Sequence, residues 1–182
     1  MLEVVFLCTG NRARSALAEA FFRRHTEGRA VSVSSYGLLR LGRVPPLPRA
    51  VAVAAAHGLD LTAHRARALE AGILGEADLV IGFEAAHVTA AIELGADPRR
   101  SFLLLELPEL LEGDAPPPDT LAPVERARHV IAEMDRRRPD GSVLPESLAD
   151  PLGGSPQVFA ETARVIDAVT GLLAASLFPP AG

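Results

Sequence analysis

The chain is poor in the features that mark several classes of protein. One cysteine in 182 residues cannot form an internal disulfide, and a free thiol suits a reducing cytosol. The net charge is −5 and no basic cluster is interleaved with aromatic residues, which argues against a nucleic-acid partner. No apolar run approaches the roughly 20 residues of a membrane helix, and the start, MLEVVFLC, is too short for a signal peptide. We expect a soluble, cytoplasmic protein without a nucleic-acid or membrane partner.

Lysine and metal-binding patterns are also missing. All 18 basic residues are arginine, a bias that accompanies the high alanine, glycine and proline content and says little about function. The five histidines show no paired ligand spacing, and the chain has neither a Walker-type loop nor a dinucleotide fingerprint. We therefore expect no metal and no organic cofactor. The histidines are His25, His57, His64, His87 and His129.

Apolar runs of strand length alternate with helical patterns over the first 107 residues. Strands that alternate with helices form parallel sheets covered on both faces, so the expected fold class is α/β. The expected strands are 2–7, 31–36, 77–83 and 101–107, and the expected helices are 15–24, 48–57 and 84–96.

The alternation then stops. GDAPPPD is typical of a linker, and 124–138 has apolar residues at helical spacing. A last helix is expected from Pro156, capped by Ser155. We predict one domain, 1–182, with an insertion at about 108–146 that contains the extra helix.

The only cysteine, Cys8, lies where an apolar run ends and a helix begins, in the segment CTGNRARS at 8–15. Gly10 and Asn11 are residue types that tolerate the backbone angles of a tight turn. N–H groups at the first turn of a helix form an anion cradle, and Arg14 can bind two oxygens of a tetrahedral dianion. The same positive field favours a thiolate. The pattern predicts a nucleophile and an oxyanion binder in one loop.

Two further polar residues are candidates with weaker support. Phosphoryl transfer through a thiolate needs a proton donor, and ADPLGGS offers Asp150, which Pro151 keeps out of a helix. The same residues also fit an ordinary Asp-Pro turn, and spacing alone does not decide between them. His64 by itself is typical of a solvated loop histidine. A buried structural cysteine is the alternative for Cys8, but the strand–loop–helix setting favours catalysis.

These residues together resemble the low-molecular-weight protein tyrosine phosphatase superfamily, which also contains arginine phosphatases and thiol-dependent arsenate reductases. The resemblance covers residues 2 to about 105 and about 147 to 177. It rests on VVFLCTGNRARSALAE, SSYG, PRAVAVAAAHGLDLTAHRAR, ADLVIGF and ADPLGGS. It implies a sheet of four parallel strands with the first strand central.

The resemblance also implies a role for each site residue. Cys8 is expected to be the nucleophile, Arg14 the phosphate clamp and Asp150 the general acid, with the Ser15 hydroxyl steadying the thiolate. Asn11 resembles a loop-shaping asparagine whose partners match Ser35 and His64. The residues expected to line the substrate are Thr9, Gly10, Asn11, Arg12, Ala13 and Ser15.

The chain departs from the family pattern in two places. The position of a second cysteine in the loop is Ala13, and a variable position beside it is Arg12. The tyrosines that often follow the Asp-Pro pair are replaced by Leu152 and Gly153, so that DPLGGS looks more like the arginine-phosphatase and reductase branches. The charge of Arg12 instead favours an aryl phosphate over phosphoarginine.

The resulting expectation is a cysteine-dependent protein phosphatase acting on phosphotyrosine through a phosphocysteine intermediate. Its partners would be a phosphorylated protein or peptide and inorganic phosphate, as product and inhibitor. Protein arginine phosphatase, arsenate reductase using an external thiol and a non-catalytic anion-binding module are the alternatives. Because the insertion directly precedes Asp150, we expect the 124–138 helix to border the active-site mouth. Its Arg136–Arg138 run would complement the helix dipole or dock an acidic substrate.

Overall fold

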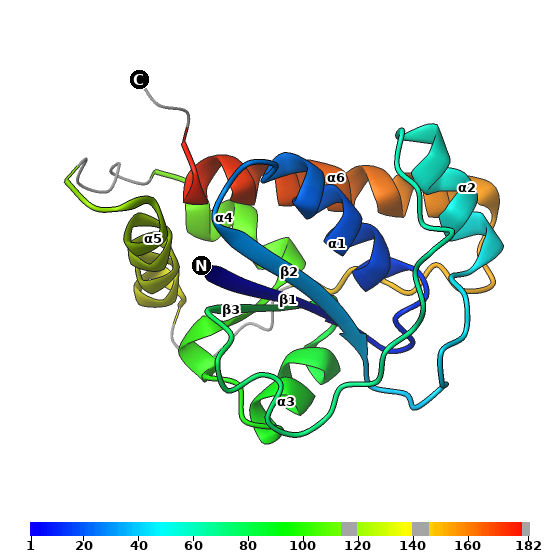
Figure 1. The fold of residues 1–182 in the computed structure, drawn as a ribbon, viewed down its shortest axis with the longest axis horizontal. Coiled ribbons are helices and arrows are strands. Elements are labelled where there is room, and N and C mark those ends of the chain that lie inside the picture. Colours follow the sequence, from blue (N-terminus) through cyan, green and yellow to red (C-terminus); the bar gives the residue numbers. More distant parts are fainter. Residues whose placement is uncertain (114–119, 140–145, 180–182) are drawn as a thin grey trace.

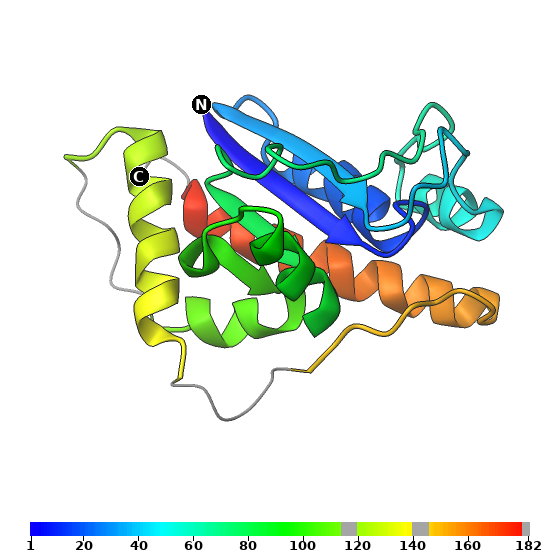
Figure 2. The ribbon, with the colours of Figure 1, turned by 90° about the horizontal axis from the view of Figure 1, so that it is seen from below.

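The computed structural model describes residues 1–113, 120–139 and 146–179. Its parallel strands form one four-stranded sheet in the order β2-β1-β3-β4. Helices cover both faces of the sheet (Figures 1 and 2). The predicted α/β class and the central position of the first strand are therefore confirmed. The strands are β1 (Leu2–Cys8), β2 (Val31–Gly37), β3 (Leu79–Gly82) and β4 (Ser101–Leu103).

Helices α1 to α3 alternate with the strands as predicted, and in the part of the chain that the structure describes three more α-helices follow the last strand. The helices are α1 (Arg14–His25), α2 (Pro48–Ala56), α3 (Ala85–Glu93), α4 (Leu107–Leu111), α5 (Pro123–Arg137) and α6 (Pro156–Leu177). The helix expected at 124–138 is α5, and α6 begins where predicted, with Ser155 Oγ accepting from the Val158 N–H at 3.4 Å. Within the described residues, no helix is long and apolar enough to span a membrane.

The central strand is buried on both faces. Val4 and Phe6 belong to the core that α1 and α6 cover, whereas Val5 and Leu7 belong to a smaller core on the opposite face. This alternation follows from the two-residue period of a strand. Cys8 lies on the α1 side of β1, 3% exposed. Burial on both faces fixes β1 as the rigid base from which the next loop starts.

The apolar run at 101–107 is not one strand. β4 ends at Leu103, a 3₁₀ turn spans Leu104–Glu106 and α4 follows. The Glu106 carboxylate accepts from the Leu103 N–H at 2.8 Å, which ends the strand, and the buried leucines beyond it recur at helical spacing. The prediction failed because periodicity cannot distinguish a short buried strand from a buried helix.

The prediction that the 124–138 helix borders the active-site mouth is wrong. Helix α5 packs on α4, on α6 and on the turn at Pro98–Arg100, at the end of the sheet where β1 begins (Figures 1 and 2). Arg138 and Asp150 are twelve positions apart in the sequence, and an extended chain of that length reaches about 40 Å. Nearness in sequence therefore did not impose nearness in space.

The three arginines at the end of α5 serve the scaffold there. Arg138 lies 4.2 Å from the centroid of the Phe102 ring and donates to the Ser101 carbonyl at 2.8 Å. Arg137 donates to two carbonyls at the end of α4, and Arg136 pairs with Glu133. Since they lie at the end of the sheet opposite Cys8, a role in docking substrate at the active site is not supported.

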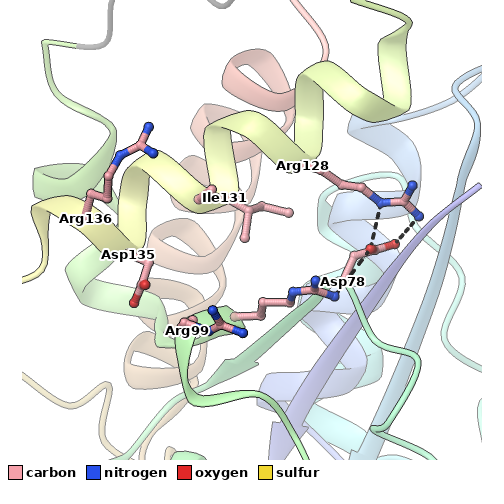
Figure 3. Close-up of a pocket in the computed structure, with 8 residues that line it drawn as sticks. Asp78, Arg99, Arg128, Ile131, Asp135 and Arg136 are labelled. Atoms are coloured by element: carbon pink, nitrogen blue, oxygen red, sulfur yellow. Dashed lines mark hydrogen bonds and ion pairs between the residues drawn. The ribbon is translucent and has the colours of Figure 1, made fainter.

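A cavity of about 300 Å³ is lined by residues of α5 and of the Pro98–Arg100 turn (Figure 3). Its charges are largely compensated within the protein. Asp78, 7% exposed, accepts from Arg128 Nε at 2.9 Å and from the Glu3 N–H at 3.0 Å, and Arg99 pairs with Asp97 at 3.0 Å. Burial raises the pKa of Asp78, but the hydrogen bonds and the arginine charges outweigh it and hold that pKa below its ordinary value. The Asp78–Arg128 pair therefore ties α5 to the sheet.

Replacing Arg128 with Met should lower the free energy of unfolding by about 1–3 kcal/mol at pH 7, because a buried carboxylate loses its main partner. Arg164→Met is the matched control, since the Arg164–Glu161 pair is exposed and should contribute little to stability. Urea unfolding of both variants measures the difference. Because the folded-state pKa of Asp78 is depressed, its stabilisation is present above the unfolded pKa of about 4 and disappears as pH falls through the folded value. A cost for Arg128→Met that did not shrink as the pH fell below about 4 would contradict this account.

Candidate active site

The loop from Cys8 to Ser15 joins β1 to α1 and is shaped by Asn11. Among the described residues, Asn11 is the only one other than glycine with a positive φ, at 51°. Its side chain donates to Ser15 Oγ at 2.9 Å and to Ser35 Oγ at 2.8 Å and accepts from the Arg67 N–H at 2.9 Å. His64 Nε2 donates to the Asn11 carbonyl at 2.8 Å. These bonds hold a left-handed conformation that costs an L-residue about 1–2 kcal/mol.

The chain between β2 and α2 holds the loop from outside. Its N–H groups bond to three loop carbonyls: Leu38 to Cys8 (3.0 Å), Leu39 to Thr9 (2.9 Å) and Leu47 to Arg12 (2.9 Å). In a trans peptide the N–H points away from its carbonyl, so the N–H groups of Thr9, Gly10 and Ala13 face the loop interior. This is the arrangement of an anion cradle.

Close approach between β2 and the loop requires a glycine. A Cβ at Gly37 would lie 2.9 Å from the Asn11 nitrogen and 2.9 Å from the Gly10 carbonyl carbon, distances that real Cβ atoms do not reach. Gly37 also pairs in register with Cys8 across the two strands. The glycine of SSYG therefore lets the sheet support the loop directly.

The Cys8 sulfur lies within hydrogen-bonding distance of two groups. Asn11 N–H donates to Sγ at 3.3 Å, and Ser15 Oγ lies 3.0 Å from it. The Ser15 oxygen accepts from the Asn11 side chain, and its proton can go to the sulfur or to the Tyr36 carbonyl, which is 3.4 Å away. Both groups can donate to an anion at this position. The sulfur faces a cavity of about 120 Å³.

Arg14 brings distant parts of the chain to this cavity. Its guanidinium is 1% exposed and lies 5.8 Å from the centroid of the Phe83 ring. It donates through Nη1 to Glu84 and to the Leu148 carbonyl at 2.8 Å, and through Nη2 to Asp150 Oδ2 at 2.7 Å. The late Asp-Pro pair is thus joined to the loop. Cavity-lining residues are Cys8, Thr9, Gly10, Arg12, Ala13, Arg14, Leu39, Leu41, Leu47, Asp150 and Leu152.

Asp150 is oriented by its own turn. Its Oδ1 accepts from the Leu152 N–H at 2.9 Å, and its Oδ2 faces Arg14. The segment before it is held by the Leu148 N–H, which donates to the Phe83 carbonyl at 2.9 Å. An aspartate that is 41% exposed at the mouth of a cavity can reach a bound leaving group.

Sequence reasoning missed two residues that follow β3, Glu84 and His87. His87 is 1% exposed; its Nδ1 accepts from the N–H groups of Phe83 (3.2 Å) and Glu84 (3.1 Å), so the proton resides on Nε2, 3.0 Å from Thr9 Oγ1. Burial, and then the charge of Arg14, lower the pKa of His87 to about 4, against the opposing effect of the nearby carboxylates. A neutral His87 therefore donates to the loop. Their position just after a predicted strand could have identified them, because ligands bind beyond the carboxyl ends of parallel strands.

Arg12 lies at the rim of the cavity, where its Nε donates to the Pro45 carbonyl at 2.8 Å. The rest of the rim is apolar and comes from the chain after β2 and from the residue two places beyond Asp150. Leu39 and Leu152 are exposed there, at 49% and 68%. The rim therefore combines one tethered cation with leucine side chains.

Comparison with known proteins agrees with this geometry. The chain is 39% identical over 84 residues to the probable low molecular weight protein-tyrosine-phosphatase EpsP of Ralstonia nicotianae, covering 46% of this chain and 57% of EpsP. It is 31% identical over 102 residues to Etp of Escherichia coli K12, a low molecular weight protein-tyrosine-phosphatase, covering 56% of this chain and 68% of Etp. The chain thus spans little more than half the length of EpsP.

A solved structure extends the likeness of fold to nearly the whole chain. The YwlE arginine phosphatase from Geobacillus stearothermophilus superimposes with a TM-score of 0.71 at 20% identity, covering 97% of this chain and 93% of that one. At that identity the match concerns the fold alone. The model of the low molecular weight phosphotyrosine protein phosphatase family matches residues 3–137, from the start of the sheet to the end of α5. The chain belongs to the low molecular weight phosphotyrosine protein phosphatase family.

Proposed function

We propose that the protein is a cysteine-dependent protein phosphatase that hydrolyses phosphotyrosine. The observation that carries this proposal is the convergence of Cys8, Arg14 and Asp150 on one cavity whose loop N–H groups face inward. Those three residues would supply a nucleophile, a bidentate phosphate ligand and a proton donor. Such a constellation serves phosphoryl transfer through a covalent intermediate.

The proposed reaction has two steps. The Cys8 thiolate attacks phosphorus, forming an S–P bond as the P–O bond to the leaving group breaks, and Asp150 gives its proton to the departing oxygen. Asp150, now a carboxylate, removes a proton from a water that attacks the phosphocysteine and releases inorganic phosphate and the thiolate. Arg14 and the N–H groups of the loop hold the transferring oxygens throughout. Inorganic phosphate would therefore be both product and competitive inhibitor.

The residues at the cavity rim favour an aryl phosphate as the substrate. Leu39, Leu41, Leu47 and Leu152 offer apolar contacts to a phenyl ring next to the phosphate. Phosphoarginine would place a second guanidinium beside Arg12 at that rim, where like charges repel. The curated relatives EpsP and Etp are named protein-tyrosine-phosphatases. A phosphorylated protein or peptide is the partner we infer.

Two further predictions belong to this proposal. The thiolate chemistry requires a reduced Cys8, which suits the cytoplasm. Residues 1–182 are proposed to form one domain, with 108–146 as an insertion that carries α5.

Turnover assays on phosphotyrosine, phosphoarginine and phosphoserine peptides, with arsenate plus an external thiol as a fourth arm, test the function. The expected order places phosphotyrosine first. Preference for phosphoarginine or thiol-dependent arsenate reduction would assign the protein to those activities instead. Phosphate binding without turnover in any arm would identify a non-catalytic anion-binding module.

Arg12 provides a test of substrate choice. Its guanidinium can stack on a phenyl ring for about 0.5–2 kcal/mol, so Arg12→Thr should shift the kcat/KM ratio from phosphotyrosine towards phosphoarginine by a few-fold to about 30-fold. Arg65→Thr is the control, because Arg65 is exposed and donates only to nearby carbonyls at 2.7 and 2.8 Å. A wild type that prefers phosphoarginine, with a ratio that Arg12→Thr leaves unmoved, would show that Arg12 does not contact the substrate.

A further inference from the structure

The Arg14 guanidinium has five N–H groups, and its protein partners use a particular three of them. Nη1 donates to Glu84 Oε1 and to the Leu148 carbonyl, which uses both of its protons. Nη2 donates one proton to Asp150. Within the described residues, the Nε–H and the second Nη2 proton have no protein acceptor. Those two donors form the edge that binds two oxygens of a phosphate in parallel. The protein contacts therefore anchor one side of Arg14 and leave the substrate-binding side available.

The two carboxylates on Arg14 differ in the part of the fold that carries them. Glu84 lies two residues beyond the end of β3 and immediately before α3, and its N–H donates to the buried His87 at 3.1 Å. Asp150 lies in the irregular segment before α6 and, as the proposed general acid, must carry a proton and turn it towards the leaving group. A protonated Asp150 no longer balances the charge of Arg14. Glu84 is then the remaining carboxylate on a guanidinium that is only 1% exposed.

We propose that Glu84 is a positioning residue that keeps Arg14 aimed at the phosphate while Asp150 exchanges its proton. This inference rests on the proposed function, because it assigns Asp150 to proton transfer. Glu84 bonds to Nη1 alone, so it opposes rotation of the guanidinium and does not compete for the phosphate-binding edge. A buried cation that lost this partner would turn towards other acceptors or water.

Glu84→Gln is the decisive variant, with Glu84→Asp as the conservative rescue and Glu161→Gln, on an exposed face of α6, as the matched control. Phosphate and vanadate binding is measured per folded protein in a Cys8→Ser background. kcat/KM is measured with the native cysteine on aryl phosphates whose leaving groups span a wide pKa range. Glu84→Gln should weaken phosphate binding about 10- to 100-fold and lower kcat/KM by a similar factor for every leaving group. Glu84→Asp should recover part of each loss, and Glu161→Gln should change neither.

Three results would overturn the inference. Unchanged phosphate binding in folded Glu84→Gln would mean that Arg14 needs no such anchor, and tighter binding would mean that Glu84 competes with phosphate. A loss of kcat/KM that grows with leaving-group pKa would instead assign Glu84 to proton transfer. If the wild type bound phosphate but turned over no phosphoester, the proposed function would fail, while the binding measurements would still decide the role of Glu84.

Discussion

Cys8→Ser is expected to abolish turnover, by about 10⁴-fold or more, while phosphate and vanadate binding stays largely intact. Removing the nucleophile of a covalent enzyme has effects of at least this size. A serine hydroxyl at this position would remain protonated, because an alcohol is a much weaker acid than a thiol. Hydrogen bonds from Ser15 and the Asn11 N–H would not make up that difference. Binding should survive because the loop N–H groups and Arg14 are untouched.

Steady-state turnover of an aryl phosphate and calorimetric titration with phosphate measure the two halves of this prediction. Ser176→Ala is the control and should change neither turnover nor phosphate binding, since Ser176 donates within α6 to the Leu172 carbonyl at 3.0 Å. A Cys8→Ser protein that still hydrolysed a phosphoester near the wild-type rate would remove Cys8 as the nucleophile. Loss of phosphate binding together with turnover would show that the sulfur shapes the cradle as well.

Asp150→Asn should slow turnover by about 10²- to 10⁴-fold for substrates whose leaving group must be protonated. The amide cannot donate a proton to the departing oxygen in the way a carboxylic acid does. In Asp150 the two oxygens accept separately, Oδ2 from Arg14 and Oδ1 from the Leu152 N–H, so the single oxygen of the amide keeps one of these bonds and loses the other. The dependence on the leaving group separates the loss of proton transfer from the loss of that hydrogen bond.

The leaving group supplies the internal control for Asp150. An activated aryl phosphate that departs as a stable anion should lose much less activity than phenyl phosphate or phosphotyrosine. A plot of the rate constant against leaving-group pKa should consequently become steeper in Asp150→Asn. Equal losses for all leaving groups would make Asp150 a partner of Arg14 and no more.

Local sequence determined the Cys8–Ser15 loop. Gly10 and Asn11 select a tight, partly left-handed turn, the short apolar run before it favours a buried strand, and Arg14 and Ser15 follow at the first turn of a helix. These are constraints within eight residues, so they act whatever the rest of the chain does. The contacts of Asn11 with Ser35 and His64 were expected from the family resemblance and lie within hydrogen-bonding distance.

Contacts between segments distant in sequence were decided by the tertiary structure. Glu84 reaches Arg14 across 70 residues and His87 reaches Thr9 across 78, because the pairing of β1 with β3 brings the carboxyl ends of the two strands together. The same applies to α5, whose amphipathic pattern predicted a helix but not the end of the sheet on which it packs. The leucines from 101 to 111 divide between strand and helix according to the neighbours they bury against. Backbone preferences act between neighbouring residues, whereas side-chain partners depend on sheet register and packing, which no local pattern specifies.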